Sequence, residues 1–105
     1  MNKHLEDLQN HLRTARHPSR SGMTKSILCN DGFRMSVQAS ESHYCSPRNN
    51  SGPWTEVEIG FPLILEPLLF DYAETKGQWT NTVYPYVPIE LAAAVIEVHG
   101  GLVEE

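Results

Sequence analysis

The segment HYCSPRNNSGPW, residues 43–54, holds the densest set of side chains in this sequence that could take part in chemistry. His43 and Cys45 are two residues apart, and alternate side chains of an extended segment share a face, so a base and a thiol could meet there. Arg48 could lower the pKa of that thiol. Three kinds of site follow from these residue types: a nucleophilic cysteine, a metal or disulfide centre, and a contact surface.

A cysteine nucleophile also needs an orienting third group and a pocket, and the sequence supplies neither in a recognisable pattern. It contains no Gly-x-Ser-x-Gly and no Cys-x5-Arg phosphate loop. Cys45 is more simply interpreted as a loop cysteine packed under Tyr44 and Pro47. We therefore expect no enzymatic activity and assign no catalytic residue.

A metal or disulfide centre would draw on Cys29, His43, Cys45 and His99. The two cysteines do not form a Cys-x-x-Cys pair. The second predicted strand lies between Cys29 and the loop that holds Cys45, and its length would place the start of that loop about 23 Å from Cys29. A disulfide needs Cα atoms within about 7 Å. His99 stands in the last turn of a predicted helix, where its ring suits the negative helix end. We expect no metal site and no cofactor.

A contact surface fits these residue types best, because tyrosine, tryptophan and arginine dominate binding hot spots. The aromatic residues fall in predicted loops or on an edge strand, and period two would place Tyr84 and Tyr86 on one face. The alternative is that the aromatic rings close the open face of the sheet. The predicted binding residues are His43, Tyr44, Arg48, Asn49, Asn50, Trp54, Tyr84 and Tyr86.

The elements that position this surface begin with a hairpin. Asn30-Asp31-Gly32 is a tight-turn signal, and apolar and polar residues alternate strictly from Phe33 to Ser40. We predict antiparallel strands near residues 24–29 and 33–40. A third strand follows Trp54, with Val57, Ile59 and Phe61 facing the core.

Two helices and an edge strand are expected next. Glu66-Pro67 predicts a helix start, with Leu68, Leu69, Tyr72 and Ala73 facing the core and an end at Lys76-Gly77. Pro85 confines the run TVYPYVP to a sheet edge.

The last helix starts at Pro88 and ends at Gly100-Gly101. Its buried residues are Ile89, Ala92, Ala93 and Ile96. Leu102 and Val103, which follow, add a short strand or cover the core.

The first 22 residues differ in character from the rest. Leu5, Leu8, Leu12 and Ala15 form one apolar stripe, which predicts a short helix, and RHPSRSG reads as a linker. We interpret residues 1–22 as a helical appendage and residues 23–105 as a single domain; the alternative is that this helix packs on the body. The N-terminus lacks the apolar region of a secretory signal.

These elements define an α+β fold: a mostly antiparallel sheet of three to five strands with two helices packed on one face, plus a short N-terminal helix. The 105 residues and a hydrophobic content of 40% suit one globular domain. The longest apolar run, FPLILEPLLF, is interrupted by Glu66 and two prolines, so we expect no membrane partner.

Charge is distributed unevenly along the chain. Residues 1–22 hold four basic and two acidic groups, a net charge of +2, whereas residues 23–105 hold four basic and eleven acidic groups, a net charge of −7. Neutralising phosphates requires basic groups, so an acidic body argues against direct nucleic-acid binding. The acidity is explained by solubility or by a partner with a basic surface.

The run NDGFRMSVQASESHYCSPRNNSGPWTEVEIGFP, with TVYPYVP and HGG further on, resembles a group of small uncharacterised proteins encoded by tailed bacteriophages and prophages. The likeness covers residues 30–101. It implies a location in the host bacterial cytoplasm and a non-enzymatic accessory role: binding a host protein or complex, with inhibition of CRISPR or another defence system as the concrete form. A homodimer is compatible with this role.

A second functional hypothesis comes from a different class. His43, Arg48, Asn49 and Trp54 could surround a pocket, and the protein would then sequester a small ligand or a nucleotide derivative. The shape of segment 43–54 decides between the two hypotheses, because a ridge favours a macromolecular partner and a concave pocket favours a small ligand.

Overall fold

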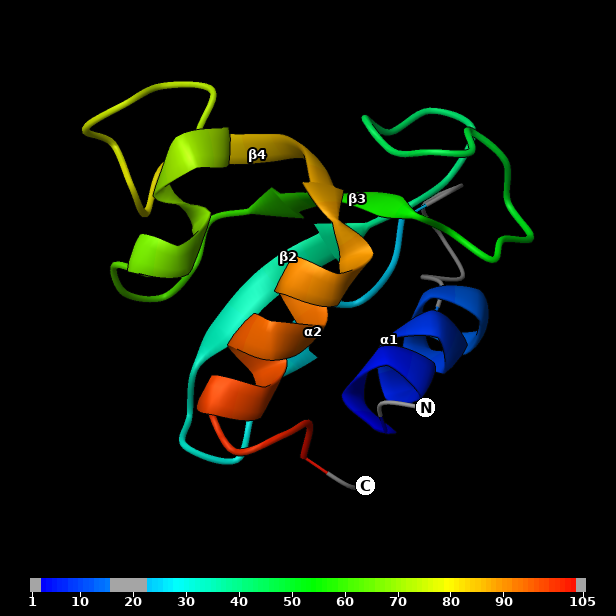
Figure 1. Cartoon of the computed structure of the whole chain (residues 1–105), viewed down its shortest axis with the longest axis horizontal. Coiled ribbons are helices and arrows are strands. Elements are labelled where there is room, and N and C mark those ends of the chain that lie inside the picture. Colours follow the sequence, from blue (N-terminus) through cyan, green and yellow to red (C-terminus); the bar gives the residue numbers. More distant parts are fainter. Residues whose placement is uncertain (1–2, 16–22, 104–105) are drawn as a thin grey trace.

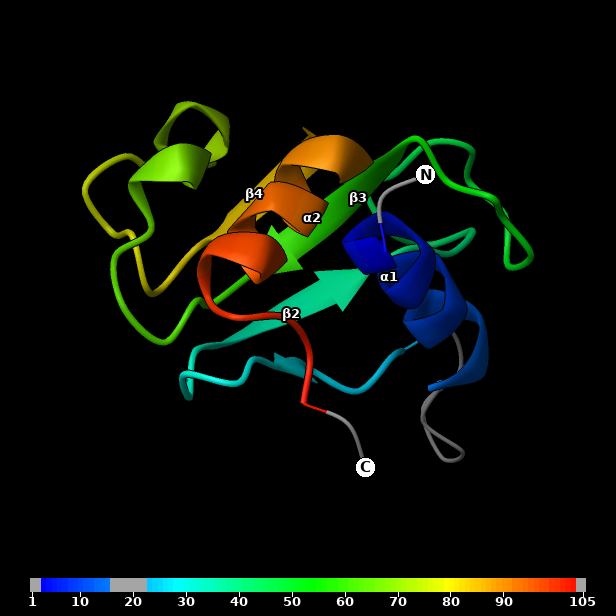
Figure 2. The ribbon, with the colours of Figure 1, turned by 60° about the horizontal axis from the view of Figure 1, so that its bottom comes forward.

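The computed structural model describes residues 3–15 and 23–103 of the chain. One antiparallel sheet has the strand order β1-β2-β3-β4. Helix α2 covers one face of this sheet, and α1 packs beside α2 on the same side (Figures 1 and 2). The predicted α+β class is confirmed. The elements are α1 (Lys3–Thr14), β1 (Ile27–Leu28), β2 (Arg34–Gln38), β3 (Glu56–Gly60), the 3-10 helix η1 (Pro67–Tyr72), β4 (Val83–Pro88) and α2 (Ile89–Val98).

The predicted hairpin joins β1 to β2. The Cys29 N–H donates to the Phe33 carbonyl at 2.8 Å, and Gly32 closes the turn with a φ of 94°. Only glycine adopts that backbone conformation without steric cost, which is why the Asp-Gly pair predicts the turn. The Phe33 N–H donates to Asp31 Oδ1 at 2.9 Å, so the Asp31 side chain braces the turn from inside.

Strand β2 follows the predicted period of two on its apolar side only. Met35, Val37 and Ala39 are buried, as expected. Gln38, on the side predicted to face water, is buried too: its amide donates to the Thr24 carbonyl at 2.8 Å and accepts from the Thr24 N–H at 2.7 Å. These two hydrogen bonds satisfy the buried amide in place of hydrogen bonds to water.

Strand β3 buries Val57 and Ile59 as predicted, but the prediction for Phe61 is wrong. Its side chain is 56% exposed and its φ is 52°. The strand ends at Gly60, and the left-handed backbone at Phe61 turns the chain out of the sheet, so the alternation of faces stops there.

The helix predicted for residues 66–77 starts where expected but ends early. Glu66 caps it by accepting the Leu68 N–H at 3.2 Å, and Pro67 is the first helical residue. The element is a 3-10 helix that ends at Tyr72 and leaves Leu68 exposed. The reason is tertiary: the Glu74 N–H already donates to the Val83 carbonyl at 3.0 Å, so the chain has returned to β4 before another helical turn could form.

The last helix matches its prediction. Ile89, Ala92, Ala93 and Ile96 are buried, and the Gly101 N–H donates back to the Ile96 carbonyl at 2.9 Å with both glycines at positive φ. Beyond it, Leu102 forms an isolated antiparallel bridge with Cys29. The C-terminal segment thus lies along the outer edge of β1.

Helix α1 contributes to the same core as the sheet. Leu8 and Leu12 are fully buried, and Gln9 exchanges two hydrogen bonds with the backbone of Trp54, at 2.8 and 3.2 Å. The predicted linker, residues 16–22, lies outside the described residues. The division of the chain at residue 22 stays a prediction, but the described helix is held by apolar burial as well as by polar contacts.

Replacing Leu12 with alanine tests this packing. Removal of a fully buried leucine side chain leaves a cavity, so we expect the free energy of unfolding to fall by about 2 to 5 kcal/mol in urea denaturation. Glu6→Ala, on the exposed side of the same helix, is the control and should change stability by less than about 0.5 kcal/mol. Equal stability of the two variants would show that α1 is an appendage.

Candidate functional site

Trp54, predicted to face a partner, is a core residue. Its side chain is 1% exposed, and its indole N–H donates to the Asn49 carbonyl at 3.2 Å. The loop folds directly over the ring: a Cβ on Gly52, whose φ is 66°, would lie 2.7 Å from the indole. A side chain enclosed by α1 and its own loop cannot contact a partner, so the prediction of an exposed Trp54 is wrong.

The two asparagines of the loop shape it from within. Asn49 Oδ1 accepts the backbone N–H groups of Ser51 at 3.1 Å and Gly52 at 2.8 Å, while Asn50 Oδ1 accepts the Glu41 N–H at 3.2 Å. Such bonds are typical of asparagine in turns. Both amide oxygens are therefore engaged in folding the loop, and a binding role for either residue stays a prediction.

The side chains of His43 and Cys45 both contact Ser40. His43 Nδ1 is 2.7 Å from Ser40 Oγ, and the buried Cys45 thiol donates to the Ser40 carbonyl at 3.1 Å. The second thiol, Cys29, is also buried; burial, with the nearby Asp31 charge, raises its pKa to about 11. A thiol with so high a pKa is a poor nucleophile at neutral pH.

Tyr84 and Tyr86 lie on opposite sides of β4, so the prediction that they share a face is wrong. Val87 pairs with Val57 and Tyr84 with Ile59, which leaves two β4 residues opposite the single residue Glu58. This bulge, with a φ of 53° at Tyr86, turns its ring outward. Tyr84 is fully buried, and its hydroxyl donates to the Trp79 carbonyl.

Three predicted residues do meet at the surface. The rings of Tyr44 and Tyr86, here called the tyrosine pair, have centroids 6.0 Å apart and planes tilted by 42°. The Arg48 guanidinium carbon lies 5.4 Å from the centre of the Tyr44 ring. Tyr44 and Tyr86 also line a shallow pocket of about 230 Å³ together with Glu74 and Pro85. This cluster is what remains of the predicted surface.

The predicted ligand-sequestering pocket lacks one of its four lining residues. It required His43, Arg48, Asn49 and Trp54 around one cavity, and Trp54 is enclosed by the protein. Within the described part of the chain, no group of three or more histidine, cysteine, aspartate or glutamate side chains is arranged to hold a metal ion.

A second surface was not predicted. Residues 61–68, here called the apolar loop, carry five large apolar side chains that are between 43% and 59% exposed: Phe61, Leu63, Ile64, Leu65 and Leu68. The loop projects at the end of the sheet opposite α1 (Figures 1 and 2). The run FPLILEPLLF is the sequence signal for this surface, but its ends also suit the strand and the helix predicted there, with Phe61, Leu68 and Leu69 in the core. Exposed apolar clusters of this kind mark interaction sites.

The apolar loop is held in place by backbone bonds at its start and by a carboxylate at its end. The Phe61 N–H donates to the Thr82 carbonyl at 3.1 Å and the Leu63 N–H to the Arg34 carbonyl at 2.8 Å. Glu66, which is 5% exposed, holds the far end of the loop. The loop is therefore fixed although its apolar side chains face outward.

Glu66 belongs to a polar cluster that the sequence did not reveal. His99 Nε2 is 2.7 Å from Glu66 Oε1, and His99 Nδ1 is 2.6 Å from Asp31 Oδ2. The imidazole ring stacks on Phe33 with centroids 4.0 Å apart. Both ring nitrogens bind carboxylates rather than the free carbonyls of α2, and the interaction of the ring with the negative helix end stays a prediction. We call this cluster the histidine bridge, formed by Asp31, Glu66 and His99.

The histidine bridge favours a charged imidazolium. Burial of the ring acts to lower the pKa of His99, but the hydrogen bonds that the ring donates to Asp31 and Glu66, together with the negative charges of these carboxylates, outweigh it and raise that pKa. The pKa of Asp31 is lowered by the Phe33 N–H and by His99. Both shifts favour the ion pair over its neutral alternative.

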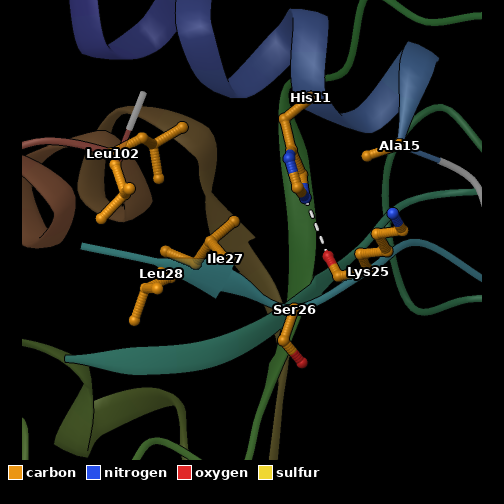
Figure 3. A pocket seen from close by; sticks show the side chains of 8 residues that line it. His11, Ala15, Lys25, Ser26, Ile27, Leu28 and Leu102 are labelled. Atoms are coloured by element: carbon orange, nitrogen blue, oxygen red, sulfur yellow. Dashed lines mark hydrogen bonds between the residues drawn. The ribbon is translucent and has the colours of Figure 1, made fainter. Parts of the chain in front are cut away.

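A groove lies between α1, β1 and the C-terminal segment (Figure 3). It encloses about 300 Å³, and His11 Nε2 is 2.8 Å from the Lys25 carbonyl at its side. Its other walls are mainly apolar: Ala15, Ile27, Leu28, Leu102 and Val103, with Ser26. The His11 imidazole in this groove is engaged with the Lys25 carbonyl.

Comparison with protein-family models, curated proteins and solved structures found no match for the chain. The resemblance to phage accessory proteins therefore stays a prediction. Among the described residues, none of the helices is both long and apolar enough to cross a bilayer.

The histidine bridge predicts a pH-dependent contribution to stability. Because the folded state raises the pKa of His99, the contribution is complete below the unfolded value of about 6.5 and is lost as the pH rises through the folded value. His99→Gln should therefore lower the free energy of unfolding more at about pH 6 than at about pH 9. His11→Gln, which removes a bond to a carbonyl instead, is the control. An equal loss at both pH values for His99→Gln would contradict an ionic bridge.

Proposed function

We propose that this chain is a binding protein that contacts a protein partner through the apolar loop. The observation that carries the proposal is the set of five large apolar side chains held outward on a fixed loop. Burying such side chains yields about 25 cal/mol per Å² of apolar area, so a partner that covers them gains substantial binding energy.

The attachment of the loop also favours recognition. Leu63 and Glu66 are tied to β2 and to His99, so the apolar side chains between them are presented on a fixed backbone. A surface that is already ordered loses less conformational entropy on binding. This supports a preformed contact site for a macromolecule at the apolar loop.

Charge narrows the class of partner. Residues 23–105 carry a net charge of −7, so a surface rich in lysine and arginine would complement them. Proteins that bind nucleic acid have such surfaces. Together with the resemblance to phage accessory proteins, this supports a bacterial host factor as the partner, and inhibition of CRISPR or another defence system as the role.

Photocrosslinking tests this proposal. A benzophenone amino acid replaces Ile64 in the apolar loop, or Glu6 on α1 as the control, and the full chain is irradiated in the bacterial cytoplasm. We expect a host protein of defined mass, identified by mass spectrometry, to be linked through position 64 but not position 6. Leu63→Asp should abolish that adduct while circular dichroism remains unchanged, because the Leu63 side chain is exposed.

Two outcomes would contradict the proposal. Identical adducts from positions 64 and 6 would mean that the capture is unspecific. An adduct of twice the chain's own mass, with no host protein, would mean that the apolar loop is an interface between two copies of this chain.

A further inference from the structure

We propose that the tyrosine pair and Glu74 form a binding pocket for a positively charged side chain, lysine or arginine, of a partner protein. The inference rests on the proposed function only in assigning the side chain to that partner. It adds the chemistry of a second contact, which lies outside the apolar loop.

The pocket has the groups that a cation needs. Its walls are Tyr44, Tyr86, Pro85 and Glu74. The faces of aromatic rings carry negative potential and attract lysine and arginine, and a carboxylate adds a full negative charge. Glu74 is exposed, and within the described part of the chain its carboxylate has neither a hydrogen bond nor an ion pair. It is therefore available to an incoming cation.

The two rings are placed by the backbone before any ligand arrives. The Tyr86 N–H donates to the Tyr44 carbonyl at 3.1 Å, and the Tyr44 N–H donates to Glu58 Oε1 at 3.0 Å. The bulge at Tyr86 directs its ring to the surface rather than into the core. A left-handed backbone at a bulky residue persists only where its surroundings enforce it, and such positions are enriched at binding sites.

Arg48 shows that the ring of Tyr44 already accepts a cation. Its guanidinium lies 5.4 Å from the ring centre, but Arg48 does not line the pocket. It is therefore a neighbour of the proposed site rather than its occupant. Its positive charge repels a second cation, so removing Arg48 should strengthen binding, the reverse of what a ligand-contacting arginine would show.

The carboxylate decides which ligand the pocket favours. An uncharged apolar side chain could also rest on two tyrosine rings, but it would gain nothing from Glu74. An anion would be repelled by Glu74 and by the acidic body. Only a cation uses the rings and the carboxylate together.

The experiment titrates the full chain with acetyl-Gly-Lys-Gly-amide, its arginine counterpart, and the uncharged norleucine counterpart, observed by ¹H–¹⁵N NMR. We expect saturable shifts at Tyr44, Glu74 and Tyr86 with a charged peptide, in the millimolar range, and none with norleucine. Glu74→Gln should weaken binding about threefold, and Arg48→Ala should strengthen it about twofold. Glu97→Gln, an exposed carboxylate on α2, is the matched control and should leave the affinity unchanged.

Binding of the norleucine peptide equal to that of the charged peptides, or no effect of Glu74→Gln, would overturn the cation pocket. No shift with either charged peptide would do the same. These results are independent of the apolar loop, because Leu63→Asp should leave peptide binding intact. Peptide binding without a photocrosslinked host protein would therefore contradict the proposed function alone, and the reverse result would contradict the pocket alone.

Discussion

The charged hydrogen bonds of His99 hold together three parts of the chain that are far apart in sequence. Asp31 lies in the β1–β2 turn, His99 follows α2, and Glu66 precedes η1. Glu66 also caps η1, so the same carboxylate sets the end of the apolar loop. Partial burial strengthens such bonds because water competes less for the charges. The histidine bridge thus fixes the end of the apolar loop, and the backbone bonds of Phe61 and Leu63 fix its start.

The two surfaces proposed for binding share a backbone feature. Among the described residues, the non-glycine residues with positive φ are Phe61 and Tyr86. Each is a bulky aromatic residue at the point where the chain departs from regular strand geometry, and each side chain is exposed. Because such a backbone is unfavourable for these residues, the surrounding hydrogen bonds must enforce it. In both cases a break in the strand geometry directs an aromatic ring toward solvent.

The sequence predicted the features that depend on local spacing. The hairpin, the apolar face of β2 and the buried stripe of α2 all follow from periodicity and glycine positions. The sequence did not predict features that depend on contacts between segments far apart in the chain. These are the bulge that separates Tyr84 from Tyr86, the early end of η1, and the enclosure of Trp54 by α1. The histidine bridge joins positions 33 and 68 residues apart, so no local pattern could indicate it. Of the predicted site, Tyr44, Arg48 and Tyr86 gather at the surface.

The protonation state of the His99 ring tests the histidine bridge most directly. A ¹⁵N NMR titration of the imidazole reports how many ring nitrogens carry a proton. We expect the ring to titrate above its usual pKa of 6.5, with both nitrogens protonated below that value. A ring that titrates at or below pH 6.5 would contradict the ionic bridge.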